Sequence, residues 1–460
     1  MTPGITPSDQ IANGFMVEKA HVFNHAAMAF SPRAGFAWDT TGKGTWVVRG
    51  GFGIYHDWID LGNDENGLKG NPPGWVLPTF IRGTNTAPVF GEGTSNTYPY
   101  GFPYPPFVST GLNDHGGLVG EQPSVGGIDA NLSSPSTYNY TVTLERELQR
   151  HLVARVGYSG SHSVDLVTGG GQVSATTYGT DINRFAGDLI QNDDVLTRLN
   201  HSFGSITYSE NGSKSTYNAL IVSLEGRFSR GFISASYTRS SSHDDSLIYP
   251  TTNVGQYYSP SAWDAPNRLA FTESYTVPGL KNPNLALRHL SNGWEVSSTT
   301  ILQSGLPYSV ATNAPFEPIF NSTGTAVIGM QPGSGDYNAD GFDYDYPNAP
   351  STGYKTATSR SAYLNGLFTA ADFPVPTMGT EGNEVANGFR GPGFAETDFA
   401  LLKNDKIGER VALQLRFEFY NVFNRPNLNG VDSNLPDGTF GRSTSQYNPR
   451  WIEFGIKLSF

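Results

Sequence analysis

Cysteine is absent from the 460-residue sequence, so neither disulfide bonds nor thiolate metal sites can form. Charged residues make up only 15% of the chain, and the formal net charge of -12 argues against a nucleic-acid-binding protein, which needs a basic face. No run of about 18 apolar residues occurs, which excludes a transmembrane helix. The N-terminal segment has neither a basic start nor an apolar core, so it is no signal peptide, and we expect the true beginning of an exported protein to precede it.

Aromatic residues and glycine are what the chain has in quantity. Aromatics reach 13% and there are 54 glycines, which is too aromatic for a disordered chain and favours strands and turns over helices. The mean hydropathy of -0.35 is polar. This average does not exclude a membrane, because a barrel strand alternates side chains that face lipid with side chains that face the lumen.

Two segments alternate cleanly with a period of two. In residues 451–460 one face carries Ile452, Phe454, Ile456 and Leu458, and the other carries Glu453 and Lys457. In residues 409–420 one face carries Leu413, Leu415 and Phe417, and the other carries Arg416 and Glu418. Each segment has about ten residues, the length that a tilted strand needs to cross a bilayer. We therefore expect the apolar face of both strands to contact lipid and the charged face to line a lumen.

Similar segments recur along the chain and bring the expected number of strands to about eleven. The others span residues 31–38, 45–55, 137–146, 151–159, 215–226, 231–239, 267–276, 293–303 and 396–403. Arg33, Arg49 and Arg155 fall on polar faces and are interpreted as lumen charges. Aromatic residues near the strand ends are interpreted as interfacial girdles; they are Trp38, Trp46, Tyr138, Tyr140, Tyr158, Trp294 and Trp451.

The connections between these segments alternate between short and long. Short ones lie near residues 39–44, 147–150, 227–230 and 404–408, with one of middling length near 277–292, and much longer polar ones lie between them. This is the pattern of an outer-membrane barrel, whose turns are short in the periplasm and long outside the cell. A barrel also has an even number of strands, so counting back from the end predicts at least one strand before Ser31, either within residues 1–30 or outside this chain.

Several blocks resemble the barrel strands of TonB-dependent receptors of the Oar-like group. They include FSPRAGFAWDTTGKGTWVVRGGFGIYHD, YNYTVTLERELQRHLVARVGYSGSHSVDL, STYNALIVSLEGRFSRGFISASYTRS, GFRGPGFAETDFALLKN and LRFEFYNVFNRPN, in family order. The resemblance extends from about residue 30 to residue 460. It implies an all-β, antiparallel transmembrane barrel, of which residues 31–460 form the C-terminal half of about 22 strands and residues 1–30 are a lead-in.

The resemblance also implies a function and a location. The expected protein is no enzyme but an outer-membrane receptor that takes up a large solute, with membrane lipid as its surroundings and no nucleic-acid partner. In the family, a plug and a TonB-contacting segment precede the barrel, and neither is present in this sequence. TonB is therefore an expected partner only through a missing N-terminal region.

The last residues match the assembly signal of outer-membrane proteins. The signal is a strand with a polar residue, a glycine, alternating hydrophobic residues and a terminal aromatic, and Glu453, Gly455, Leu458 and Phe460 fit its spacing. An edge strand of this kind offers unpaired backbone groups to the barrel assembly machinery. We predict that this strand is the signal, although any barrel strand alternates in the same way.

One short motif suggests a cation. Asp336, Asn338 and Asp340 precede a glycine as in a calcium loop, because oxygen ligands at alternate positions and a sharp turn suit a hard cation. The match fails at its twelfth position, which is Pro347, so the commoner interpretation is a solvated acidic turn. Apart from this calcium, no cofactor is expected.

Two other classes remain compatible with the sequence. One is a complete small porin of about twelve strands, which requires a further strand within residues 1–30. The other is a secreted, β-rich enzyme acting on polysaccharide, which would dissolve without detergent.

Overall fold

The computed structural model describes most of the predicted strands and part of the long connections. The described residues are 11–15, 29–57, 71, 112–118, 122–168, 183, 198–204, 206–245, 258–314, 318–323, 327–330, 335, 337, 344–354, 357, 359–377, 382–408 and 410–460. Within them, no helix has the length and apolar character needed to cross a membrane.

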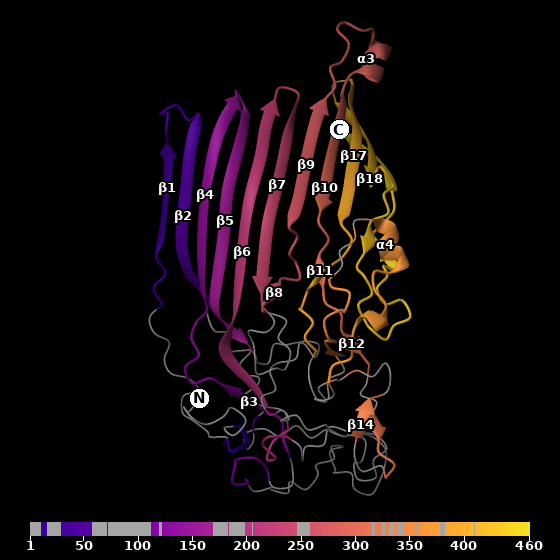
Figure 1. Cartoon of the computed structure of the whole chain (residues 1–460). Helices are drawn as coiled ribbons and strands as arrows, with labels where there is room; N and C mark the ends of the chain where they lie inside the picture. Colours follow the sequence, from indigo (N-terminus) through magenta and orange to yellow (C-terminus); the bar gives the residue numbers. More distant parts are fainter. Residues whose placement is uncertain are drawn as a thin grey trace, which may run out of the picture.

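Eleven strands lie side by side in one antiparallel sheet (Figure 1). In spatial order they are β1 (Arg33–Asp39), β2 (Trp46–His56), β4 (Ser136–Gln149), β5 (Leu152–Thr168), β6 (Ile206–Phe228), β7 (Gly231–Asp244), β9 (Asn267–Thr276), β10 (Trp294–Gln303), β17 (Phe394–Ile407), β18 (Val411–Tyr420) and β21 (Trp451–Ser459). Every predicted strand is present, which confirms the strand count and the antiparallel class. Two short strands, β3 (Val125–Ile128) and β8 (Ser259–Pro260), extend the sheet beside β6 and β7.

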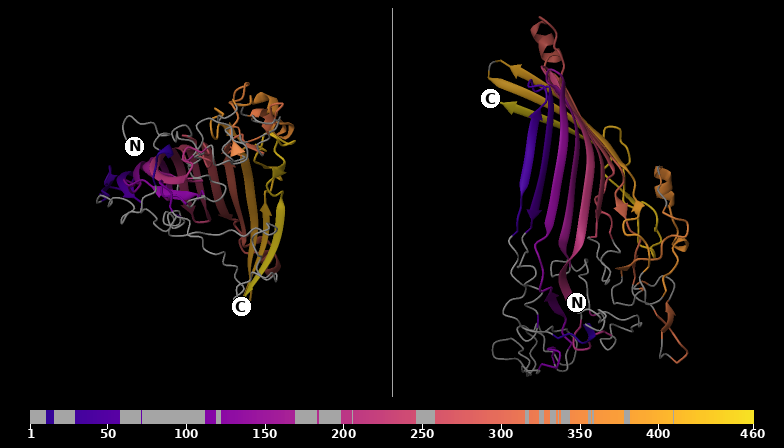
Figure 2. Two further views of the ribbon diagram at one scale, coloured as in Figure 1. Left: turned by 90° about the horizontal axis from the view of Figure 1, so that it is seen from below. Right: turned by 60° about the vertical axis from the view of Figure 1, so that its left-hand side comes forward.

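The sheet is curved but open in the described part of the chain (Figure 2). β1 pairs with β2 alone and β21 with β18 alone, so each has one unpaired edge there. The strand predicted before residue 31 lies outside the described residues, which include only 11–15 and 29–30 of that segment.

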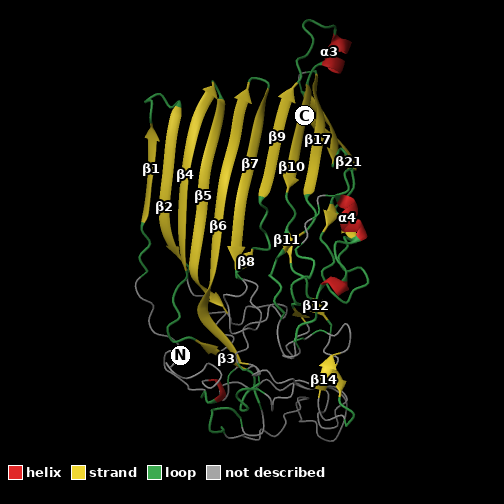
Figure 3. Ribbon diagram, viewed as in Figure 1, coloured by secondary structure: helices red, strands yellow, loops and turns green. Residues whose placement is uncertain are grey.

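All the short connections lie at one end of the sheet, and the described parts of the long ones lie toward the other (Figure 3). We call these the short-turn end and the long-loop end. The connection between β9 and β10 is the longest at the short-turn end and contains the helix α3 (Leu285–Ser291). The C-terminus lies at the same end (Figure 1).

Several strands run further toward the long-loop end than the sequence predicted. β5 has 17 residues and β6 has 23, because the backbone ladder continues after the alternation of side chains fades. Backbone hydrogen bonds require no particular side chain, so strand pairing outlasts the hydrophobic pattern that reveals it.

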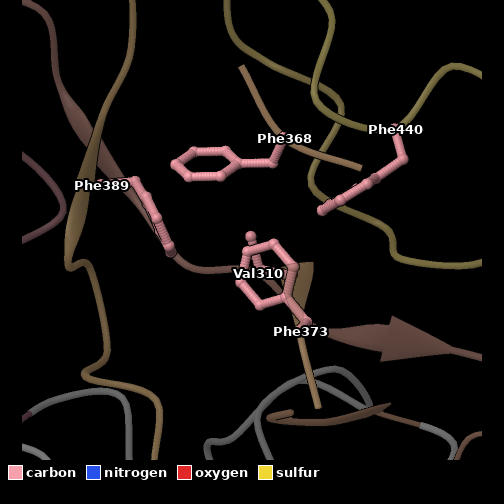
Figure 4. Close-up of a cluster of buried hydrophobic side chains, with 5 residues drawn as sticks. All are labelled: Val310, Phe368, Phe373, Phe389 and Phe440. Atoms are coloured by element: carbon pink, nitrogen blue, oxygen red, sulfur yellow. The ribbon is translucent and has the colours of Figure 1, made fainter. Parts of the chain in front are cut away.

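The long connections after β10 and β18 are predicted as polar loops, but they fold together around an apolar core (Figure 4). Val310, Phe368, Phe373, Phe389 and Phe440 are each at most 8% exposed. We call this structure the loop cap. The two connections contain the elements β11 (Pro307–Tyr308), β12 (Thr312–Asn313), β13 (Pro318–Phe320), β14 (Val327–Met330), β15 (Tyr344–Asp345), α4 (Arg360–Asn365), η3 (Ala370–Asp372), β16 (Phe389–Arg390), β19 (Leu428–Asn429) and β20 (Ser445–Gln446).

Candidate functional site: a two-faced wall and its loop cap

One face of the sheet is apolar, as the alternation predicts. On the last two strands, direct cross-strand partners lie on the same face, and these partners are Leu413 with Leu458, Leu415 with Ile456, Phe417 with Phe454 and Phe419 with Ile452. On β21 the four apolar side chains are 57–61% exposed. Apolar side chains so exposed in a continuous row are the signature of a surface that contacts lipid.

The same face continues across the sheet to β1. A row of direct partners crosses the first five strands at one level and consists of Trp38, Val48, Leu144, Val156 and Val222. Four of the five are apolar aliphatic side chains, so the apolar surface is a property of the whole wall.

Tyrosine hydroxyls mark this face toward the long-loop end. Tyr140 and Tyr158 both donate to Oδ1 of Asn218, at 2.9 and 2.7 Å, and their rings stack with centroids 6.2 Å apart. Tyr237 donates to Oδ1 of Asn267 at 2.8 Å. Side chains with an apolar ring and a hydrogen-bonding tip suit a membrane interface.

Six of the seven aromatic residues predicted as girdles lie on the apolar face, but the prediction is wrong for Trp451. Trp451 is the direct partner of Tyr420 and lies on the polar face with Glu453. Its Nε1 donates to Oε1 of Glu453 at 3.2 Å. The alternation of β21 itself requires this position, because Trp451 and Glu453 are two residues apart.

The opposite face is hydrophilic and carries a chain of ion pairs. Glu145 Oε1 lies 3.4 Å from Nε of Arg49 and 3.3 Å from Nε of Arg155, and Arg155 Nη1 lies 2.8 Å from Oε1 of Glu225. These four residues join β2, β4, β5 and β6. On β18 the guanidinium of Arg416 pairs with Glu418. Such a surface suits a water-filled lumen.

Some charged side chains lie on the apolar face near the short-turn end. They include Arg146, Glu273, Lys403 and Asp405. Each has a partner; for example, the Arg146 guanidinium lies over the Trp46 ring at 4.6 Å. Their position near the ends of the strands places these charges close to the membrane surface.

The predicted assembly signal lies on an accessible strand. Glu453 and Gly455 are on the polar face of β21, Leu458 is on the apolar face, and Phe460 follows the strand fully exposed. The free edge of β21 leaves this segment open to pairing in the described part of the chain. Its role in assembly stays a prediction.

The predicted calcium ligands cannot be placed. Asp336, Asn338 and Asp340 lie outside the described residues. Among the residues that are described, no group of three or more acidic or imidazole side chains could hold a metal ion.

A buried carboxyl lies in the loop cap, and sequence reasoning missed it. Glu384 is 3% exposed, and its Oε1 accepts a hydrogen bond from the Val310 N–H at 2.8 Å. Burial raises the pKa of Glu384 to about 9, and the hydrogen bond from Val310 opposes this shift. A long connection without alternation gives no sequence signal for a buried site.

The loop cap is tied to the sheet by an ion pair. The Arg390 guanidinium on β16 contacts the carboxylate of Asp264, which is 3% exposed and precedes β9. Asn387 adds a hydrogen bond from its side-chain amide to the Pro260 carbonyl oxygen at 2.8 Å. These contacts hold the cap against the connection between β7 and β9.

Comparison with known proteins gives a family and a set of structural neighbours. The sequence profile of the outer membrane beta barrel domain family matches residues 4–453. None of the curated proteins compared with the chain matches it. Similar solved structures include the outer membrane transporter YddB from Escherichia coli, at 12% identity and a TM-score of 0.45 over 93% of this chain and 40% of that one.

Two further neighbours have comparable values. The siderophore receptor PirA from Pseudomonas aeruginosa has 10% identity and a TM-score of 0.36, with 93% of this chain and 41% of that one covered. The ferric citrate transporter FecA has 10% identity and a TM-score of 0.39, with 93% and 38% covered. The chain thus spans about two fifths of the length of these transporters.

Proposed function

Because the chain belongs to the outer membrane beta barrel domain family, we propose that its sheet is part of the wall of a larger TonB-dependent receptor that imports a large solute. The chain is an outer-membrane protein with an antiparallel β-barrel fold. We further propose that the whole barrel has about 22 strands, that this chain supplies only part of them, and that the receptor belongs to the Oar-like group.

The observation that carries the proposal is a two-faced wall with two unpaired edges. In hydrocarbon, each unsatisfied backbone group costs several kcal/mol, so a spanning sheet has to close. The edges of β1 and β21 are unpaired in the described part of the chain, and further strands between them would close the barrel. Eleven strands with an ion-paired polar face then supply about half of a 22-stranded barrel.

The loop cap supports the import of a cargo too large for a narrow pore. In an outer-membrane barrel the long loops are outside the cell, where cargo first meets the receptor. A cap with its own apolar core, fixed to the sheet by Arg390 and Asp264, gives that surface a defined shape. In this proposal, TonB would act through segments other than the strands described here.

Refolding tests the proposal against the small-porin alternative. Residues 1–460 alone, refolded in detergent, should aggregate or stay unfolded, and supplying a preceding half of the barrel should rescue folding. The measurement is heat-modifiable gel migration, which reports closed barrels. A stable, heat-modifiable and pore-forming species from residues 1–460 alone would establish the small porin instead.

A further inference from the structure

The helix α3 at the short-turn end is an unusual surface for a turn. Asn284 begins it, since its Oδ1 accepts the Leu287 N–H at 2.8 Å, and it ends where the Asn292 N–H donates to the Arg288 carbonyl oxygen at 3.1 Å. None of its residues is buried. The helix projects beyond the ends of the strands (Figure 1).

Three contacts hold α3 on the apolar side of the sheet. His289 Nδ1 lies 2.8 Å from Oδ2 of Asp405, the direct partner of Leu413 on the apolar face. The Lys403 ammonium, on the same face, donates to the Asn292 carbonyl oxygen at 2.6 Å. Trp294 Nε1 donates to the Leu290 carbonyl oxygen at 2.8 Å. The helix is therefore anchored outside the lumen, next to the lipid-contacting surface.

The exposed side chains of this segment are leucines beside cations. Leu280, Leu285, Leu287 and Leu290 are 55%, 64%, 46% and 71% exposed. Leu287 and Leu290 are three residues apart and so lie on the same side of the helix. Lys281 and Arg288 are also exposed. Four leucines that remain in water do not stabilise a turn, because an apolar side chain contributes favourable free energy only when its surface is buried.

We propose that residues 280–291 form an interfacial anchor that inserts these leucines into the inner leaflet of the outer membrane. Lys281 and Arg288 then contact the phosphate groups of the phospholipids. Segments that expose apolar side chains next to cations bind lipid surfaces in this way, at the boundary between headgroups and acyl chains.

Continuity with the lipid-contacting face favours phospholipid over a protein partner. The anchor points Lys403 and Asp405 are in the same cross-strand rows as Leu415 and Leu413, so lipid that covers these leucines reaches the base of α3. The cations provide the matching charge for phospholipid phosphates. A second copy of the chain or a periplasmic protein would leave this charge unexplained.

The absence of cysteine makes a site-directed label straightforward. A nitroxide at Leu290→Cys would be compared, in outer membranes isolated from cells that produce the protein, with labels at Val222→Cys and Lys43→Cys. Val222 is on the apolar face, and Lys43 is in the exposed turn between β1 and β2. Collision rates with oxygen, which dissolves in lipid, and with a water-soluble nickel chelate report the depth of each label.

We expect the ratio of oxygen to nickel collision rates at Leu290→Cys to be several-fold higher than the ratio at Lys43→Cys. It should approach the ratio at Val222→Cys. Leu287→Cys should behave in the same way and replaces Leu290→Cys if that variant fails to accumulate. A ratio equal to that of Lys43→Cys, while Val222→Cys reports lipid, would overturn the anchor. Protection from both colliders at Leu290→Cys would likewise overturn it and would indicate a protein partner.

Discussion

Leu415 on β18 lies directly opposite Ile456 on β21, and both side chains are on the apolar face of the sheet. This pair is near the middle of both strands. Leu415→Arg should therefore destabilise the assembled barrel. An arginine on the lipid-facing side costs about 2–4 kcal/mol at the centre of the bilayer and about 0–1 kcal/mol near its surface, and Leu415, the direct partner of Lys403, lies between these depths. The measurement is the free energy of unfolding of the assembled protein in lipid vesicles.

Gln414→Arg provides the matched control for this substitution. Gln414 is the neighbouring residue and faces the opposite side of the sheet, with Lys457 as its direct partner. An arginine there stays hydrated and should change the free energy of unfolding by less than about 1 kcal/mol. Equal costs at the two positions would show that Leu415 does not face lipid and Gln414 the lumen.

Phe389→Ala should unfold the loop cap without opening the sheet. Phe389 is 1% exposed, and its ring lies 4.9 Å from those of Phe368 and Tyr354, measured between centroids. Removing a buried phenylalanine costs about 3–5 kcal/mol of folding free energy, which is a large loss for a core of only five buried side chains. Limited proteolysis of intact cells should show new cleavage within residues 304–393, with unchanged heat-modifiable migration. Loss of the barrel band itself would contradict the separation of cap and sheet.

The loop cap should lose stability as the pH rises. The folded-state pKa of Glu384 is raised to about 9, mainly by burial, while its unfolded value is near 4.5. The proton on Glu384 therefore stabilises the cap fully below pH 4.5, and this contribution is lost as the pH rises through 9. Proteolysis of the cap should accelerate over this interval.

Glu384→Gln is the test of that pH dependence. The amide keeps an oxygen for the Val310 N–H and carries no titratable proton. In this variant, cleavage of the cap should vary less between pH 5 and pH 9 than in the parent protein. An identical pH profile in the two proteins would assign the effect to another group.

Removing Phe460 should lower the amount of protein in the outer membrane several-fold. Phe460 is fully exposed and contributes no packing, so its loss has no reason to destabilise the folded sheet. The measurement is the outer-membrane level of the protein, with Ser459→Ala as a control that keeps the terminal aromatic. Unchanged accumulation without Phe460 would remove it from the assembly signal.

The sequence by itself determined the strands and the facing of their side chains. Period-two alternation in segments such as residues 411–420 and 451–459 is a local property, because successive side chains on a strand point to opposite faces. The alternation of short and long connections likewise placed all the turns at one end of the sheet.

Only the tertiary structure decided which distant residues meet. Val310 and Phe440 share one core, and His289 reaches Asp405, although each pair is more than 100 residues apart in the chain. Neither contact leaves a periodic pattern, because irregular loops are held by side-chain packing and individual hydrogen bonds. The cap, the buried Glu384 and the position of α3 on the lipid side therefore followed from the fold alone.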